Sequence, residues 1–213
     1  MNGVVSIVDY GAGNLFNVQR ALEHLGAKVE RVTRPEQIPT ADRIVLPGVG
    51  AFGKAMQQLR QRRMVTALRE FAASGRPFLG ICLGMQLMLD ESEEFGTTPG
   101  LGIVPGRVES IPSTDTEGKP LNVPHIGWTP IHPAAKGNWS ETPLEATPPG
   151  EAFYFVHSLV VRPQRPEDIV AECNYGGHSL TAAIANGNCF GCQFHPEKSA
   201  TAGLKLIARF LQS

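Results

Sequence analysis

One cysteine stands in a context that favours nucleophilic chemistry. Gly80-Ile81-Cys82-Leu83-Gly84 is a G-x-C-x-G pentapeptide between an apolar stretch and the helix-forming Met85-Gln86-Leu87-Met88-Leu89. This is the thiol version of the nucleophile elbow, a sharp strand-to-helix turn that exposes the nucleophile. The turn needs glycine on both sides because side chains there would collide, and the start of the helix favours a thiolate. We predict Cys82 as a nucleophile and the Leu83 N–H as an oxyanion donor; the alternative is a buried structural cysteine.

Of the six histidines, His195 is best placed to serve such a thiol. It lies in Gln193-Phe194-His195-Pro196-Glu197-Lys198, at the end of a predicted strand. Residues i and i+2 of an extended segment project to the same side, so Glu197 can hydrogen-bond one ring nitrogen and leave the other for Cys82. The set then comprises nucleophile, base and orienting carboxylate. For the hexapeptide alone, a surface histidine beside a solvated glutamate is the alternative.

A glycine-rich turn follows another predicted strand. In Pro47-Gly48-Val49-Gly50, two glycines flank Val49. Such a peptide can turn either its carbonyl or its N–H toward a ligand at low steric cost. By itself the turn is a weak signal, because glycine turns after strands are common.

Composition limits the classes of protein to which the chain can belong. The 213 residues are 42% hydrophobic and 18% charged, with a net charge of −1. This is typical of a globular chain with a sizeable core, and no global basic field exists to hold nucleic acid or an anionic membrane. The N-terminal apolar run Val4–Val8 is too short for a signal peptide or a membrane span. With four cysteines and no export signal, we expect free thiols and a cytoplasmic location.

The elements that must position these residues alternate in the first half of the chain. Strands are predicted at 4–8, 28–32, 43–46 and 78–81, and helices at 14–25 and about 53–73, the latter in one piece or two. Strands that alternate with helices of this length indicate βαβ units and a parallel sheet.

The second half is rich in turns. A short strand is predicted at 107–111, and strands at 153–156, 169–173, 181–185 and 189–194 are expected to be antiparallel. An amphipathic helix near 204–211 closes the chain. We therefore predict one α/β domain over residues 1–213. Its central, mostly parallel sheet is flanked by helices and carries an antiparallel C-terminal extension.

These residues resemble the class I glutamine amidotransferases, a flavodoxin-like α/β family. Further motifs narrow the resemblance to the glutaminase subunits of imidazole glycerol phosphate synthase, and they run in family order from residue 9 to 199. They are Asp9–Leu15, Leu46–Phe52, Leu79–Leu87, Pro124-His125-Ile126-Gly127-Trp128, Tyr154–Ser158 and Gly191–Ser199.

The resemblance implies a reaction and a partner. Cys82 would attack the side-chain amide of L-glutamine, giving a thioester and ammonia, and water would release glutamate. Ammonia would pass to a separate (β/α)8-barrel cyclase subunit in a heterodimer, whose lyase step makes imidazole glycerol phosphate and aminoimidazole carboxamide ribotide in histidine biosynthesis. No cofactor or metal is implied.

The resemblance also implies roles by position. Val49 and Leu83 would form the oxyanion hole. Gly50, Gln86 and Ser158 would hold glutamine. Asn14, Trp128 and Tyr154 would lie at the cyclase interface. Leu159 stands where the family commonly has an aromatic residue, so the local substrate contact is expected to differ.

Two other features are interpreted as structural. Cys189-Phe190-Gly191-Cys192 is a C-x-x-C, but residues 189 and 192 of a strand point to opposite faces, so we expect neither a zinc site nor a disulfide. Glu91, Glu93 and Glu94 form an acidic cluster that we interpret as a solvated helix face.

Two alternatives remain open. One is the glutaminase of another class I amidotransferase, such as those of pyridoxal phosphate, anthranilate or guanylate synthesis, although the P-H-I-G-W segment argues against it. The other is a non-catalytic module that binds a partner, against which the intact Cys82, His195 and Glu197 argue.

Overall fold

The strand that ends at Cys82 lies beside the strand that leads to His195. The computed structural model describes residues 4–11 and 13–213. In it, β4 (Phe78–Cys82) pairs in parallel with β13 (Cys189–Cys192), with Ile81 opposite Cys192. Because the carboxyl ends of parallel strands meet at the same sheet edge, the elbow and the histidine segment emerge together.

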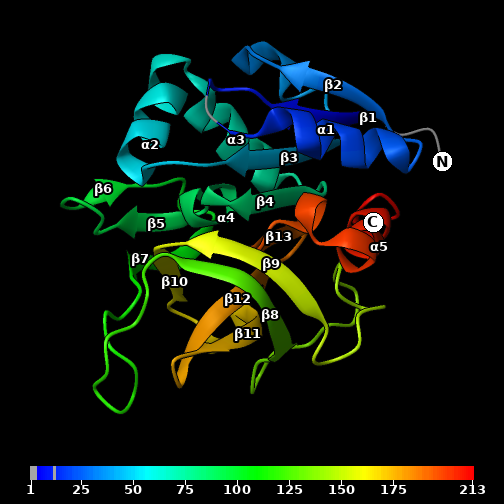
Figure 1. Ribbon diagram of the computed structural model, residues 1–213. Coiled ribbons are helices and arrows are strands. Elements are labelled where there is room, and N and C mark those ends of the chain that lie inside the picture. Colours follow the sequence, from blue (N-terminus) through cyan, green and yellow to red (C-terminus); the bar gives the residue numbers. More distant parts are fainter. Residues whose placement is uncertain (1–3, 12) are drawn as a thin grey trace.

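The large sheet combines a parallel half with an antiparallel half. Its order is β2-β1-β3-β4-β13-β12-β11-β8-β9 (Figure 1). The other strands are β1 (Val4–Val8), β2 (Lys28–Val32), β3 (Arg43–Gly48), β8 (His125–Pro133), β9 (Ala152–His157), β11 (Ile169–Tyr175) and β12 (His178–Asn186). Strands β1 to β4 and β13 are parallel, and the strands from β12 to β9 continue the sheet by antiparallel pairing. This arrangement confirms the predicted sheet, except that β13 belongs to both halves.

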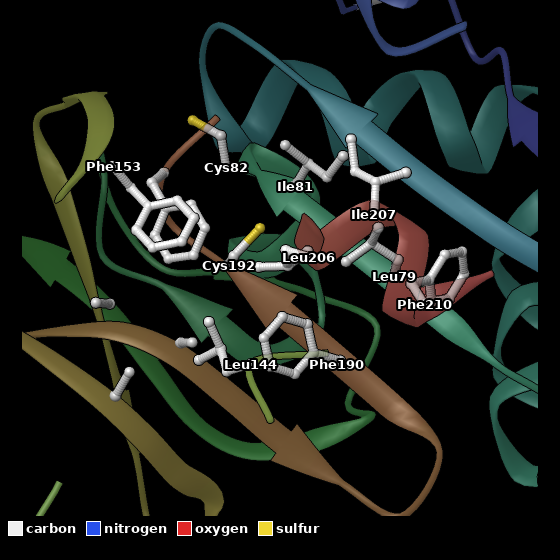
Figure 2. Packing of buried hydrophobic residues seen from close by; sticks show 14 of the residues in the cluster. Leu79, Ile81, Cys82, Leu144, Phe153, Phe190, Cys192, Leu206, Ile207 and Phe210 are labelled. Carbon is white, nitrogen blue, oxygen red and sulfur yellow. The ribbon is translucent and has the colours of Figure 1, made fainter. Parts of the chain in front are cut away.

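Helices cover both faces of the parallel half, as its almost continuously buried strands β1, β3, β4 and β13 require, whereas the edge strand β2 is mostly exposed. One face packs against α1 (Leu15–His24) and α5 (Ala200–Phe210), and the other against α2 (Phe52–Gln61), α3 (Met64–Ala73) and α4 (Leu83–Leu87). Figure 2 shows Leu206, Ile207 and Phe210 of α5 gathered near Leu79 of β4. The predicted helix near 53–73 is indeed two helices. Within the described residues, no helix is long and apolar enough to span a membrane.

A second sheet was not predicted. It has the order β10-β7-β5-β6 and consists of β5 (Leu89–Ser92), β6 (Thr98–Pro99), β7 (Val104–Ser110) and β10 (Leu159–Pro163). Short 3₁₀ turns are η1 (Pro35–Gln37), η2 (Pro166–Asp168) and η3 (Pro196–Lys198). Because α4 ends at Leu87 and β5 follows, the interpretation of the acidic cluster as a helix face is wrong. Glu91 lies in a strand, and Glu93 and Glu94 follow it.

The elbow is held by close backbone contacts, which gives a first prediction. A Cβ atom at Gly84 would overlap the carbonyl oxygen of Leu46 on β3. Gly84→Ala is therefore expected to destabilise the protein by about 3 kcal/mol or more, since neither backbone can yield without breaking the sheet. Urea unfolding measures the loss.

Gly53 in α2 is the matched control. Its nearest neighbour to an added Cβ, Thr98 Oγ1, lies at 3.6 Å, an ordinary contact. Gly53→Ala is expected to leave stability unchanged or raise it slightly, because alanine is the better helix former. Equal unfolding free energies for the two variants would show that the approach of Leu46 is not a constraint.

Candidate active site

The cysteine at the end of β4 has a strained backbone. Cys82 has φ 54° and ψ −111°, a conformation that residues other than glycine rarely adopt. A Cβ at Gly80 would lie 2.9 Å from the carbonyl oxygen of Gly84, so the two glycines let the turn close. The collisions predicted from the pentapeptide are confirmed. The thiol itself is nearly buried, with the residue 6% exposed.

His195 and Glu197 form a buried pair. His195 Nδ1 lies 2.8 Å from Glu197 Oε1, and the two side chains are 3% and 1% exposed. Because the carboxylate can only accept, Nδ1 donates and the tautomer is set. Burial by itself lowers the pKa of His195, but the interactions with Cys82 and Glu197 outweigh it and raise that pKa to about 9. His195 thus holds its proton at neutral pH, in position to protonate a leaving group.

The second ring nitrogen of His195 is left for the thiol. His195 Nε2 is buried and has no hydrogen-bond partner among the described residues. The neighbouring Cys82 is one of the groups that raise the pKa of the ring. A buried, unpartnered nitrogen next to a thiol is the arrangement that proton transfer during catalysis requires.

Hydrogen bonds to strand β9 hold the backbone of His195 in place. The His195 N–H donates to the carbonyl of Tyr154 at 2.9 Å. Ser199 Oγ donates to the His195 carbonyl at 2.7 Å and accepts the Tyr154 N–H at 2.9 Å. Ser199 is fully buried, and no feature of the sequence pattern singled it out. These bonds join η3 to β9 and fix where the imidazole stands.

The predicted site residues border one cavity of about 390 Å³, which opens over the thiol. Its lining includes the predicted Cys82, His195, Val49, Leu83, Gly50, Gln86 and Ser158. Glu197 lies behind His195 and does not line it. The sequence reasoning missed Glu94, Pro124, Val156, His157 and Lys198, which also line it, and Leu159 is there as well. The volume suits a small amino-acid substrate.

A larger cleft lies elsewhere. It measures about 620 Å³ and is open, along β5, β7 and β10, with Arg107, Arg162 and Glu109 in its wall. These charges pair with one another, Arg107 with Glu109 and Arg162 with Glu109. The lining contains neither cysteine nor histidine, so the smaller cavity is the candidate active site.

The glycine turn forms one wall of the smaller cavity. A Cβ at Gly48 would press on the Tyr10 hydroxyl and lie 3.0 Å from Leu83 Cβ, so only glycine fits there. Gly50 has φ 101° with open space around it, so its constraint is the backbone conformation. The Tyr10 hydroxyl donates to the carbonyl of Pro47 at 3.1 Å and anchors the start of the turn. The turn is thus anchored where it begins, at Pro47, whereas Val49 at its centre is 45% exposed.

Glu94 has a structural role beside this turn. Its Oε2 accepts the N–H of Phe52, the first residue of α2, at 2.7 Å. An acidic side chain at the start of a helix accepts a hydrogen bond from an N–H that has no partner within the helix, and its negative charge interacts favourably with the helix dipole. Glu94 therefore ties the loop after β5 to the segment that follows Gly50. No periodicity in the sequence could have revealed this contact.

Two buried histidines, His125 and His157, form a chain of hydrogen bonds at the cavity edge. His157 Nδ1 must donate to the carbonyl of Leu159 at 2.7 Å, because a carbonyl only accepts. His157 Nε2 then accepts from His125 Nδ1 at 3.0 Å, and His125 Nε2 accepts from Thr129 Oγ1 at 2.8 Å. Both rings are neutral in this pattern. His125 is the first residue of β8.

This histidine chain predicts acid sensitivity. Burial lowers the pKa of His157 to about 4. An unfolded histidine titrates near ~6.5, so the unfolded state binds the proton first as pH falls. The contribution of neutral His157 to the free energy of unfolding is therefore fully present above pH ~6.5. It decreases as the pH falls toward ~4, by about 3 kcal/mol in all. Measured by urea unfolding, the free energy of unfolding of wild type should fall by about 2 kcal/mol more than that of His157→Gln when the pH is lowered from 7 to 4.5. Parallel pH profiles for the two proteins would contradict this.

The remaining thiols are buried apart from the cavity. Cys189 and Cys192 pack in clusters on opposite faces of the large sheet, as predicted. Burial raises the pKa of Cys173 to about 12 and that of Cys189 to about 11, so both stay protonated. In the described part of the chain, no group of three or more His, Cys, Asp or Glu side chains is arranged to hold a metal ion.

Of the residues expected at a partner interface, Tyr154 lies beside Lys198, which lines the cavity. Trp128 on β8 lies opposite Tyr154 on β9, their rings 6.1 Å apart, and Trp128 is 53% exposed. Asn14 stands at the start of α1, and both α1 and β9 contact η3. Lys198 Nζ lies 5.8 Å from the centre of the Tyr154 ring and also lines the cavity.

Known proteins have sequences similar to that of this chain. A family model described as glutamine amidotransferase class-I matches residues 6–213. The chain is 47% identical to imidazole glycerol phosphate synthase subunit HisH 1 of Legionella pneumophila strain Lens, over 98% of each chain. It is 45% identical to the HisH subunit of Methylococcus capsulatus, over 98% of this chain and 95% of that one.

Solved structures share the fold. PurLQS from Thermotoga maritima gives a TM-score of 0.74 at 20% identity, over 100% of this chain and 99% of that chain. A structure described as a glutamine amidotransferase gives 0.72 at 20% identity, covering 99% and 98%. These likenesses confirm the predicted fold class. The chain belongs to the class-I glutamine amidotransferases and, within them, to the family of the HisH subunits of imidazole glycerol phosphate synthase.

Proposed function

We propose that residues 1–213 act as one glutaminase domain, the ammonia-producing subunit of imidazole glycerol phosphate synthase in histidine biosynthesis. The observation that carries the proposal is the meeting of Cys82, His195 and Glu197 at one small cavity, from a strained elbow and a buried pair. The HisH relatives support the synthase over other class I amidotransferases.

The first half of the reaction uses the Cys82 thiolate and the protonated histidine. Cys82 Sγ attacks the side-chain carbonyl carbon of glutamine, and the carbonyl electron pair moves to oxygen. The N–H groups of Val49 and Leu83 stabilise that oxyanion. As the intermediate collapses, the C–N bond breaks and His195 Nε2–H protonates the departing nitrogen, which leaves as ammonia. A thioester remains on Cys82.

The second half regenerates the thiolate and the protonated histidine. Neutral His195 takes a proton from water, which attacks the thioester and releases glutamate. Glu197 keeps the imidazole oriented throughout and stabilises its charged form. Gly50, Gln86 and Ser158 hold the substrate along the cavity wall. The chemistry is nucleophilic and acid–base throughout and needs no cofactor.

We propose a (β/α)8-barrel cyclase as the partner. Subunit naming among the relatives implies a partner, and the exposed Trp128 with Tyr154 and Asn14 offers it a surface beside the cavity. The lyase step belongs to that partner, and this chain supplies the hydrolase step. Buried free thiols are compatible with the cytoplasmic location that we propose.

Glutamate release tests the function. The chain is mixed with its cyclase and a ribotide substrate analogue, and glutamate is quantified with glutamine or asparagine as substrate. We expect release from glutamine and little from asparagine, whose carbonyl is one methylene nearer its α-carbon. Complex formation without glutamate release under all conditions would instead identify a non-catalytic binding module.

A further inference from the structure

Gln193 is a fully buried polar residue that the mechanism above does not use. It follows β13, two residues before His195, and its side chain is inaccessible to solvent. Resting on the proposed function, we propose that Gln193 is a positioning residue for the nucleophile: its amide holds the sulfur of Cys82 and stabilises the thiolate.

Both ends of the Gln193 carboxamide are engaged. Nε2 donates to Cys82 Sγ at 3.6 Å, and Oε1 accepts from Gln86 Nε2 at 3.0 Å. The backbone N–H of Gln193 donates to Ala182 on β12 at 2.9 Å, which fixes the base of the side chain. The contact with Gln86 orients the amide, because an accepting oxygen on that side leaves the N–H groups on the side of the sulfur.

The sulfur needs such a donor. Its other polar neighbour besides the facing His195 is the carbonyl of Val156, at 4.0 Å, which can accept from a thiol but repels a thiolate. Cys82 is 6% exposed, so little water reaches the anion. Gln193 Nε2 lies within hydrogen-bond distance of the sulfur and is a side-chain donor to it in addition to the facing His195. Hydrogen bonds to charged groups are stronger than neutral ones, especially where solvent is excluded.

The donor acts at two points of the reaction. It favours the thiolate before attack and keeps the sulfur in line with the cavity. It acts again when the thioester breaks, as the C–S electron pair returns to sulfur and restores the negative charge. Gln86 lines the cavity while bonded to Gln193, so the residue proposed to hold glutamine also orients the group that holds the nucleophile.

Two variants separate the donor from the acceptor. Gln193→Met keeps the length of the side chain and removes both hydrogen bonds. Gln193→Glu keeps an oxygen for Gln86 but offers the sulfur a carboxylate instead of an N–H. Cys189→Ala is the matched control, because it alters a buried side chain of β13 that packs on the opposite face from Cys192.

The readout is the rate of Cys82 alkylation by iodoacetamide against pH, followed by mass spectrometry of the peptide that contains Cys82. In both Gln193 variants we expect alkylation at pH 7 to fall about tenfold and its midpoint to move up by about one pH unit. The Cys189→Ala profile should match wild type. For Gln193→Glu, kcat for glutamate release should fall more than KM changes, because the Gln86 contact is retained.

The outcomes are distinguishable. If Gln193→Met folds and its profile of alkylation rate against pH matches that of wild type, the inference is wrong. If Gln193→Met does not fold, a wild-type alkylation profile in Gln193→Glu contradicts the inference instead. Alkylation needs no glutamine, so it is independent of the proposed function. If the wild-type protein still releases glutamate after Cys82 has been fully alkylated, the proposed function is wrong. If alkylation inactivates the wild type but the alkylation profiles of the Gln193 variants match that of wild type, only this inference is wrong.

Discussion

Replacing Cys82 with alanine is expected to abolish glutamate release and to leave folding and partner binding intact. The change removes the attacking sulfur and the hydrogen bond that it accepts from Gln193, and it leaves the backbone of the buried strand in place. In triads of this kind, losing the nucleophile leaves only the catalysis that the oxyanion donors and binding supply. Glutamate release measured with the cyclase present should fall by at least ~10⁴-fold.

Two further variants sharpen this test. Glu197→Gln should reduce the rate less than Cys82→Ala, because Glu197 orients the base and transfers no proton itself. Cys82→Gly should be at least as stable as Cys82→Ala, although glycine usually costs ~0.5–1 kcal/mol relative to alanine. The positive φ of Cys82 is the reason, since glycine adopts it without strain. Substantial activity in Cys82→Ala would show that the nucleophile is misassigned.

The isolated chain is expected to be a poor glutaminase that its partner switches on. Ammonia released without an acceptor is wasted, and the turn at Val49 provides a means of control. Its base is anchored through Pro47 and Gly48, while Gly50 faces open space, so the central peptide can rotate. Losing one oxyanion donor typically costs ~10²–10³ in turnover. The partner can favour the competent state only if it binds that state more tightly.

Val49→Pro tests this switch. Proline deletes the N–H that Val49 would offer to the oxyanion, so the stimulated rate should fall by ~10²–10³ and the basal rate far less. Glutamate is measured for the chain alone, with cyclase, and with cyclase plus a ribotide analogue. Equal wild-type rates in all three conditions would refute the switch without affecting the glutaminase assignment.

The sequence by itself determined the local chemistry and the alternation of strands and helices in the first half of the chain. Gly80, Cys82 and Gly84 predict the elbow because the steric demand of a tight turn acts within five residues. The pairing of His195 with Glu197 is as predicted, at 2.8 Å, but the predicted extended segment is wrong, because Pro196–Lys198 forms the 3₁₀ turn η3 and this turn brings the carboxylate to the ring. The βαβ half follows from hydrophobic periodicity, which is also a local property.

Only the tertiary structure decided which distant segments meet. Gln193 reaches Gln86 across 107 positions and Cys82 across 111, and Glu94 reaches Phe52 across 42. Such contacts depend on strand pairing between β4 and β13 and on a second sheet built from short, weakly patterned strands. The acidic residues near Glu94 were misread because a short polar run carries no clear period, and packing against α2 decided their conformation. Periodicity reports which face of an element is buried, but the choice of neighbour is made by the whole chain as it packs.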